Sequence, residues 1–217
     1  MSARDFLSEH TGYDRDDKKI FRLILRSSEN RARKLIEFLK EAKGRLDLTN
    51  IIDRQGYSPL IFSIFKDRSL AAKILLDHVK VVENASNPEL VAGASLSVPQ
   101  SPRSTLPMQT KTLKEWINFK NKKESGMAAI HYVAFNGDLM LMKELIANGA
   151  NPLQKNDTGM TALQFAAQGN QPAIITYLLD FQNIGIDELD VKKSSAVHWA
   201  IFNSNELALG FLLARKP

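Results

Sequence analysis

The chain has 217 residues, a net charge of +5 and a hydrophobic fraction of 44%, which is enough for one large or two small folded domains. It contains no cysteine, which excludes disulfides, thiolate metal sites and cysteine nucleophiles within these residues. No apolar run reaches the roughly 20 residues of a membrane helix, and the charged start MSARDFLSEH lacks the apolar segment of a secretion signal. We therefore expect a cytoplasmic chain without a membrane span.

Residues 1–80 carry helical patterns that are less regular than those further along the chain. Apolar residues over 20–24 predict one helix, and apolar positions at helical spacing predict a second over 31–42. The basic residues of the second helix indicate a solvated face; the alternative is attraction to an acidic partner or an anionic membrane surface. We expect this pair to cap the N-terminal end of a repeat array, with a degenerate repeat after it.

Residues 83–111 are rich in Ser, Pro and Ala and poor in aromatic residues. This composition supplies little apolar surface for a packed unit, so it predicts a flexible insertion. Leu60 and Ile130 are 70 positions apart, which leaves room for one more repeat, but no good copy of the motif lies between them. Ordered structure is expected to resume near Thr112, where Trp116 offers an apolar anchor.

From 112 to 217 the sequence repeats itself with a period of 33 to 34 residues. The motifs GMAAIHYVAF, GMTALQFAAQ and KSSAVHWAIF begin at Gly126, Gly159 and Lys193, and a looser copy, GYSPLIFSIF, begins at Gly56. Apolar pairs that follow the motifs keep the same phase, at 145–146, 178–179 and 212–213.

The motif and its period resemble the ankyrin repeat, which reads T-P-L-H-x-A over 33 residues. The resemblance implies an all-α ankyrin-repeat solenoid, built from helix–turn–helix repeats with short β-hairpin fingers. Residues 112–217 should hold about three repeats, the last one cut short. No such repeat can cover its own apolar face, so stacking is expected to supply the core.

Local signals fit these boundaries. Ser58 and Thr161 stand where first helices should begin, as N-cap residues do, and Gly149 stands where a helix should end in a left-handed residue. His131 and His198 occupy the His position of the motif, where the imidazole is expected to bond the backbone of its own loop. No carboxylate cluster, nucleophile–base pair or phosphate-binding loop accompanies them. We therefore expect no catalytic residue, no metal site, no cofactor and no enzyme activity in this chain.

Candidate binding residues follow the small pair at the end of each first helix, where an ankyrin array faces its concave groove. They are Phe65-Lys66, Phe135-Asn136, Gln168-Gly169 and Phe202-Asn203. A row of Phe side chains is suited to anchoring a peptide; the alternative is that each ring folds under its own finger into the core. Trp199, next to the motif His, is a further candidate. The predicted function is therefore a protein–protein interaction module that binds a protein or short peptide. Nucleic-acid binding is not predicted, because it would rest on the positive charge alone.

A second resemblance concerns the last two repeats. Residues 163–172, LQFAAQGNQP, followed by 195–214, SAVHWAIFNSNELALGFLLA, resemble the N-terminal ankyrin region of DHHC-type palmitoyltransferases, which carries AAQGDQP and then STPLHWA. The chain departs from that pattern at Ser195-Ala196, where the family has Thr-Pro. The resemblance implies an alternative function at a membrane's cytosolic face, as the substrate-recruiting region or a truncated relative of such an enzyme. Trp199 would then help to hold a short substrate peptide.

Overall fold

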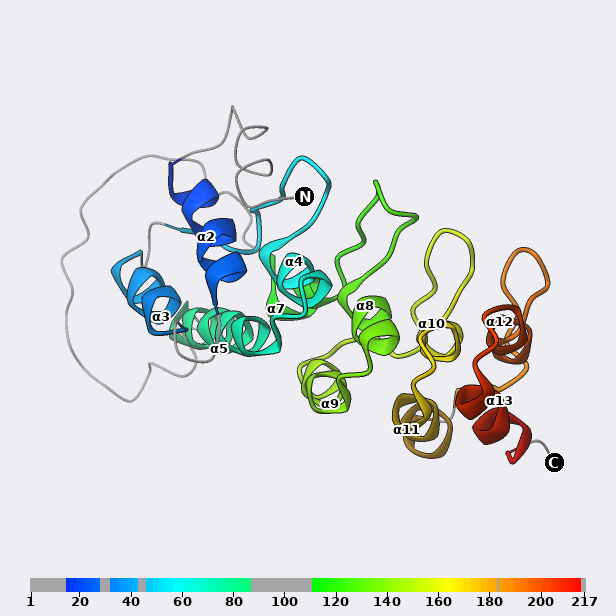
Figure 1. Ribbon diagram of the computed structural model, residues 1–217. Coiled ribbons are helices and arrows are strands. Elements are labelled where there is room, and N and C mark those ends of the chain that lie inside the picture. The colour runs from blue at the N-terminus through cyan, green and yellow to red at the C-terminus, as the bar shows by residue number, and fades with distance from the viewer. Residues whose placement is uncertain (1–14, 28–31, 43–45, 87–110, 183, 216–217) are drawn as a thin grey trace.

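The computed structural model describes residues 15–27, 32–42, 46–86, 111–182 and 184–215. Its helices, labelled as in Figure 1, are α2 (Arg15–Arg26), α3 (Ala32–Glu41), α4 (Pro59–Phe65), α5 (Ser69–Ser86), α7 (Leu113–Ile117), α8 (Ala129–Asn136), α9 (Leu139–Ala147), α10 (Ala162–Gln168), α11 (Pro172–Gln182), α12 (Ala196–Phe202) and α13 (Glu206–Leu213). The predicted all-α repeat fold is confirmed.

The helices form a stack of antiparallel pairs (Figure 1). The first helices α4, α8, α10 and α12 stand in one row, and the second helices α5, α9, α11 and α13 stand in the other. At the N-terminal end, α2 packs on α4 and α3 packs on α5, so this pair covers that end of the stack. Of the predicted region 1–80, residues 1–14, 28–31 and 43–45 lie outside the described residues.

The helix boundaries follow the predicted capping residues. The Ser58 hydroxyl accepts a hydrogen bond from the Ile61 N–H and is followed by Pro59 at the first helical position of α4. Gly149 has φ 95° after α9, and the Ala150 N–H donates to the Leu145 carbonyl at 2.9 Å. This six-to-one bond across a left-handed glycine satisfies the last carbonyls of the helix.

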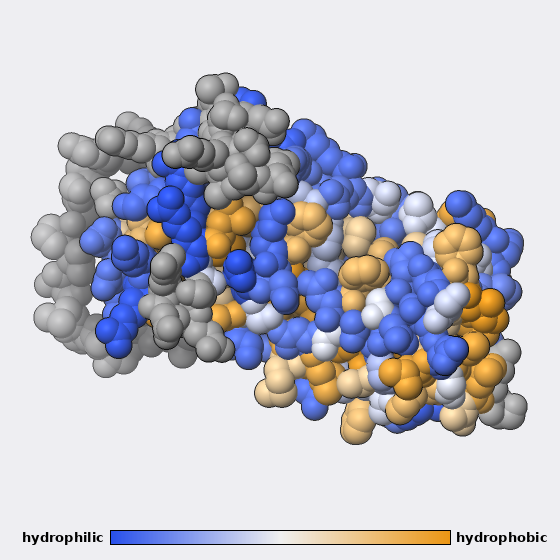
Figure 2. Space-filling view, in the orientation of Figure 1, coloured by the Kyte–Doolittle hydropathy of each residue, from blue (hydrophilic) through white to orange (hydrophobic). Residues whose placement is uncertain are grey.

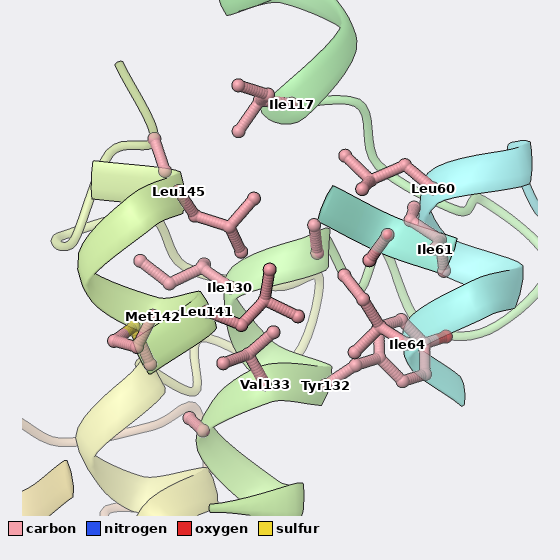
Figure 3. Close-up of a cluster of buried hydrophobic side chains, with 14 of the residues drawn as sticks. Leu60, Ile61, Ile64, Ile117, Ile130, Tyr132, Val133, Leu141, Met142 and Leu145 are labelled. Carbon is pink, nitrogen blue, oxygen red and sulfur yellow. The ribbon is translucent and has the colours of Figure 1, made fainter. Parts of the chain in front are cut away.

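The first helix of the early repeat, α4, packs directly against α8. Residues 83–86 of the predicted insertion continue helix α5, and residues 87–110 lie outside the described residues. Thr112 caps α7 through a capping box with Glu115, so the chain is ordered at the predicted position. Figure 3 shows Ile117 of α7 above a cluster of buried side chains from α4, α8 and α9, so this short helix completes the core at the junction.

The fingers that precede the first helices are turns, and the prediction of β-hairpins was wrong for the described residues. There the only bridge outside the helices is an isolated antiparallel one between Asn121 and Met127. Each finger is held instead by a buried Asp or Asn whose Oδ1 accepts the backbone N–H two residues later. These residues are Asp53, Asn121, Asn156 and Asp190. Their side chains take acceptor positions that a strand ladder would otherwise fill.

Candidate functional site

The exposed ends of the first helices form the candidate site. In α8 every residue from Ala129 to Ala134 is buried, and only the last two, Phe135 and Asn136, are exposed. Phe65, Phe135 and Phe202 occupy the same repeat position and are 43%, 46% and 80% exposed. Gln168, which fills this position in the remaining repeat, is half-buried. The three rings therefore lie largely outside the core and on one row of helices.

Phe65 is held in an aromatic cluster at the start of this row. Its ring stacks on Tyr57 with centroids 5.0 Å apart and meets Tyr132 edge-on at 6.1 Å. The Lys66 ammonium lies 4.5 Å from the Phe65 ring centroid. Tyr57 and Tyr132 are buried, so they form a fixed base from which the Phe65 ring projects. Such a supported aromatic ring can bind an apolar side chain with little loss of conformational freedom.

Glu124 ties this cluster to the next finger. Its carboxylate accepts hydrogen bonds from the Tyr57 hydroxyl and, at 3.0 Å, from the Tyr132 hydroxyl. Burial and the neighbouring Glu124 carboxylate both raise the pKa of the two phenols, so they stay protonated and donating. Glu124 was not predicted as a site residue, because Tyr57, one of its two partners, lies 67 residues before it.

A second aromatic cluster lies at the other end of the row. The Trp199 ring is half-buried and meets Phe202 edge-on, with centroids 5.9 Å apart. The Trp199 indole N–H donates to Asp190 Oδ2 at 3.1 Å, so this donor is already satisfied by the finger. The ring offers its apolar surface to a ligand while Asp190 fixes its orientation.

The two asparagines of the predicted site are used within the fold. The Asn136 amide donates to the Ile64 carbonyl at 2.8 Å, which joins α8 to the end of α4. The Asn203 amide donates to the Trp199 carbonyl of its own helix at 2.9 Å. The amide oxygen of each could accept a hydrogen bond from a ligand, but the main role of Asn136 is to connect two repeats.

Comparison with known proteins identifies the repeats. Residues 112–216 match the family model for ankyrin repeats in three copies. This part of the chain is an ankyrin-repeat domain.

Three relatives share parts of this chain's sequence. Dog inversin is 32% identical over 94 residues, covering 43% of this chain and 9% of that protein. Rat mitochondrial disaggregase is 46% identical over 44 residues, covering 20% of this chain and 6% of that protein. Mouse protein phosphatase 1 regulatory subunit 27 is 38% identical over 55 residues, covering 25% of this chain and 36% of that protein. The chain thus spans only a small part of these relatives, and none of the three is named as a palmitoyltransferase.

His131 shows how neighbouring ankyrin repeats are joined. Its Nδ1 accepts from the Ala128 N–H, as predicted, and its Nε2 lies 2.9 Å from the Gln154 carbonyl of the following finger. The ring is fully buried, and this burial lowers the pKa of His131 to about 4. Gln164 performs the same two tasks one repeat later, bonding the Thr161 N–H and the Ser194 carbonyl.

No group of three or more His, Asp or Glu side chains in the described part of the chain could hold a metal ion. No helix within the described ranges is both long and apolar enough to cross a membrane.

Proposed function

We propose that the chain is a protein–protein interaction module that binds an extended peptide or a protein loop along the first-helix row. The observation that carries the proposal is the exposure of Phe65, Phe135 and Phe202 at one repeat position. Fully burying a Phe side chain stabilises a complex by roughly 1.5–3 kcal/mol, so three such rings can anchor a partner. One relative is named as a regulatory subunit of protein phosphatase 1, a name that describes action on another protein.

The charge on the fingers favours an acidic partner. Exposed basic residues stand on all four fingers, at Arg54, Lys122, Lys123, Lys155, Lys192 and Lys193. Of these, Lys155 forms an ion pair with the Glu188 carboxylate. The exposed acidic residues on the fingers are fewer, Asp157 and Asp187, and Asp157 Oδ1 lies 4.0 Å from Lys120 Nζ. A segment with acidic residues beside an apolar anchor would meet both the rings and these ammonium groups.

The test combines capture with a stability control. A photo-crosslinking residue at position 135 should capture a partner from the native proteome that the same residue at Met140 does not. Met140 is 66% exposed but lies on the second-helix row. In a pull-down of the partner so identified, the double variant Phe135→Ala, Phe202→Ala should bind it less than the parent chain does, while its melting temperature stays nearly unchanged. Undiminished binding of the partner would refute binding along the first-helix row. A large fall in melting temperature would show that the rings belong to the core.

The alternative is the substrate-recruiting region of a membrane-bound DHHC-type palmitoyltransferase, at a membrane's cytosolic face. It is supported by the HWA segment around Trp199 and by the supported, half-buried position of that ring. Coding sequence that runs on past Pro217 into hydrophobic spans and a cysteine-rich segment would favour it, and a stop codon there would refute it. In either case we propose that residues 1–217 act by binding and not by catalysis, in the cytoplasm.

A further inference from the structure

One end of the stack carries an apolar surface that the other repeats bury. We name it the end face and define it by Val197, His198 and Ile201 of α12 and Leu209 of α13. Figure 1 shows α12 and α13 as the last pair of the stack, and Figure 2 shows hydrophobic residues gathered at that end. The opposite end is covered by α2 and α3. Terminal repeats of such proteins need a polar outer face for solubility, and the end face lacks one.

Residues at equivalent positions of the inner repeats show what the end face would contact. Ile201 is 59% exposed, whereas Ala134 and Ala167 at the same position are 0% exposed. Val197 is half-buried, whereas Ile130 and Leu163 are 1% exposed. In the inner repeats these positions are covered by the next helix pair, as α10 is covered by α12. The end face therefore continues an interface that the stack already forms.

Leu209 on the second helix behaves in the same way. It is half-buried, whereas Met142 and Ile175 at the same position are 0% exposed because the following second helix covers them. Both helices of the last pair thus present a surface to a missing neighbour. A surface made by two helices is matched by a helix pair rather than by a single extended strand.

A polar group on the end face points to the same neighbour. His131 and Gln164 each bond a backbone carbonyl of the following finger, at Gln154 and Ser194. His198 stands at the same position, and its Nδ1 accepts from the Ser195 N–H at 3.1 Å. Its ring is exposed, and among the described residues no hydrogen-bond partner lies at Nε2. This nitrogen is left for the carbonyl of one more finger.

We propose that the end face docks a further ankyrin-type unit, a finger followed by a helix pair, from outside the described residues. The incoming first helix must carry small residues opposite Ile201, because Ile201 is larger than the alanines that fill this position elsewhere. Ala196 and Ala200 of α12 illustrate such a surface, since both are 0% exposed where α12 lies against α10. A second copy of this chain fits less well: its covered N-terminal end is closed to stacking, and its own end face offers bulky residues.

The probe is the chain extended by a duplicate of its own last unit. Residues 182–213 are repeated after Arg215 in place of residues 216–217, with Ile201→Lys in the duplicate alone to make the new end polar. Stacking should raise the melting temperature of the whole chain by at least about 3 °C. The His198 ring N–H should become protected from exchange in NMR spectra, and the helical signal in circular dichroism should grow. An isolated helix pair does not fold alone, so a folded duplicate is a stacked one.

Matched variants separate the end face from a general effect of length. In the extended chain Ile201→Glu, in the original copy, should cancel the gain in melting temperature. Leu207→Glu should leave it, because Leu207 is 60% exposed at a position where Met140 is also 66% exposed. An unchanged melting temperature with no added helix would overturn the proposal. So would an Ile201-dependent dimer of the unextended chain in sedimentation experiments, which would assign the end face to a second copy.

Discussion

The side-chain amide of Asn136 donates to the backbone carbonyl of Ile64 across 72 residues of sequence, with the two atoms 2.8 Å apart. This bond fixes the end of α8 to the end of α4. The residues that separate these two first helices in sequence include the predicted insertion. Asn203 stands at the same repeat position but bonds only its own helix. The two residues form a natural pair for measurement.

Asn136→Ala should lower the free energy of unfolding by about 1 kcal/mol, because the hydrogen bond between α8 and α4 is lost and the Ile64 carbonyl is left with local backbone donors such as the Asp67 N–H. Asn203→Ala should change it by only a few tenths of a kcal/mol, since its bond is local and exposed. Urea unfolding of both variants measures the difference. Equal effects of the two changes would contradict a joining role for Asn136.

His131 should make the fold sensitive to acid. Its pKa is lowered to about 4 in the folded chain, against 6.5 in the unfolded chain. Above pH 6.5 both states hold a neutral ring; as the pH falls toward 4, only the unfolded state takes up the proton. Stability is therefore lost over this window, at no more than about 1.4 kcal/mol per pH unit.

His131→Gln should remove this loss, because Gln164 already makes the same two bonds in the next repeat without a titrating group. Urea unfolding at pH 7 and pH 5 gives the comparison, and the variant should lose less stability between the two values. His198→Gln, at an exposed ring, is the control and should keep the acid response of the parent chain. An identical acid response in His131→Gln would locate the sensitivity elsewhere.

Glu124 should contribute more to the free energy of unfolding than an ordinary surface carboxylate does. Glu124→Leu removes the carboxylate that accepts from two buried phenols, which should cost about 1–3 kcal/mol. Tyr132→Phe removes only one of the two bonds and should cost less. Chemical unfolding ranks the variants; a cost for Glu124→Leu no greater than for Tyr132→Phe would show that the Tyr57 bond contributes nothing.

Lys193 adopts a left-handed backbone with φ 63°, where the corresponding residues Gly56 and Gly159 have φ 85° and 77°. A side chain in this conformation costs roughly 1–2 kcal/mol, partly offset by the greater freedom of glycine in the unfolded chain. Lys193→Gly should therefore raise the melting temperature, and Gly159→Lys should lower it. Differential scanning calorimetry checks both signs, and a fall for Lys193→Gly would refute the strain.

The sequence predicted whatever depends on residues near one another in the chain. Helix starts at Ser58 and the left-handed end at Gly149 are local, and both were correct. The prediction of β-hairpin fingers was wrong, because the side-chain oxygen of the Asp or Asn in each finger accepts backbone N–H groups that a strand would bond. The recurring Asp or Asn three residues before the finger glycine was a visible signal of this, at Asp53 and Asn156.

Equivalent positions in the motif did not mean equivalent surroundings. His131 and His198 share one place in the repeat, but the first is buried because another repeat follows it, and the second is exposed. Asn136 was predicted only as a binding residue, because its partner Ile64 lies beyond the insertion. The sequence pattern identifies each repeat, and the repeats packed beside it determine which of its residues are buried, exposed or bonded.

The direct packing of α4 on α8 explains why the chain tolerates a long segment at that point. Leu60 and Ile130 are 70 positions apart, against 33 between Ile130 and Leu163, so the stretch of chain between these two first helices is about twice as long. Each doubling of a loop raises the entropic cost of closing it by only about 0.6 kcal/mol. One hydrogen bond such as that of Asn136 offsets a cost of this size. We therefore expect the stack on either side to tolerate changes in the length of the sequence between α5 and α7.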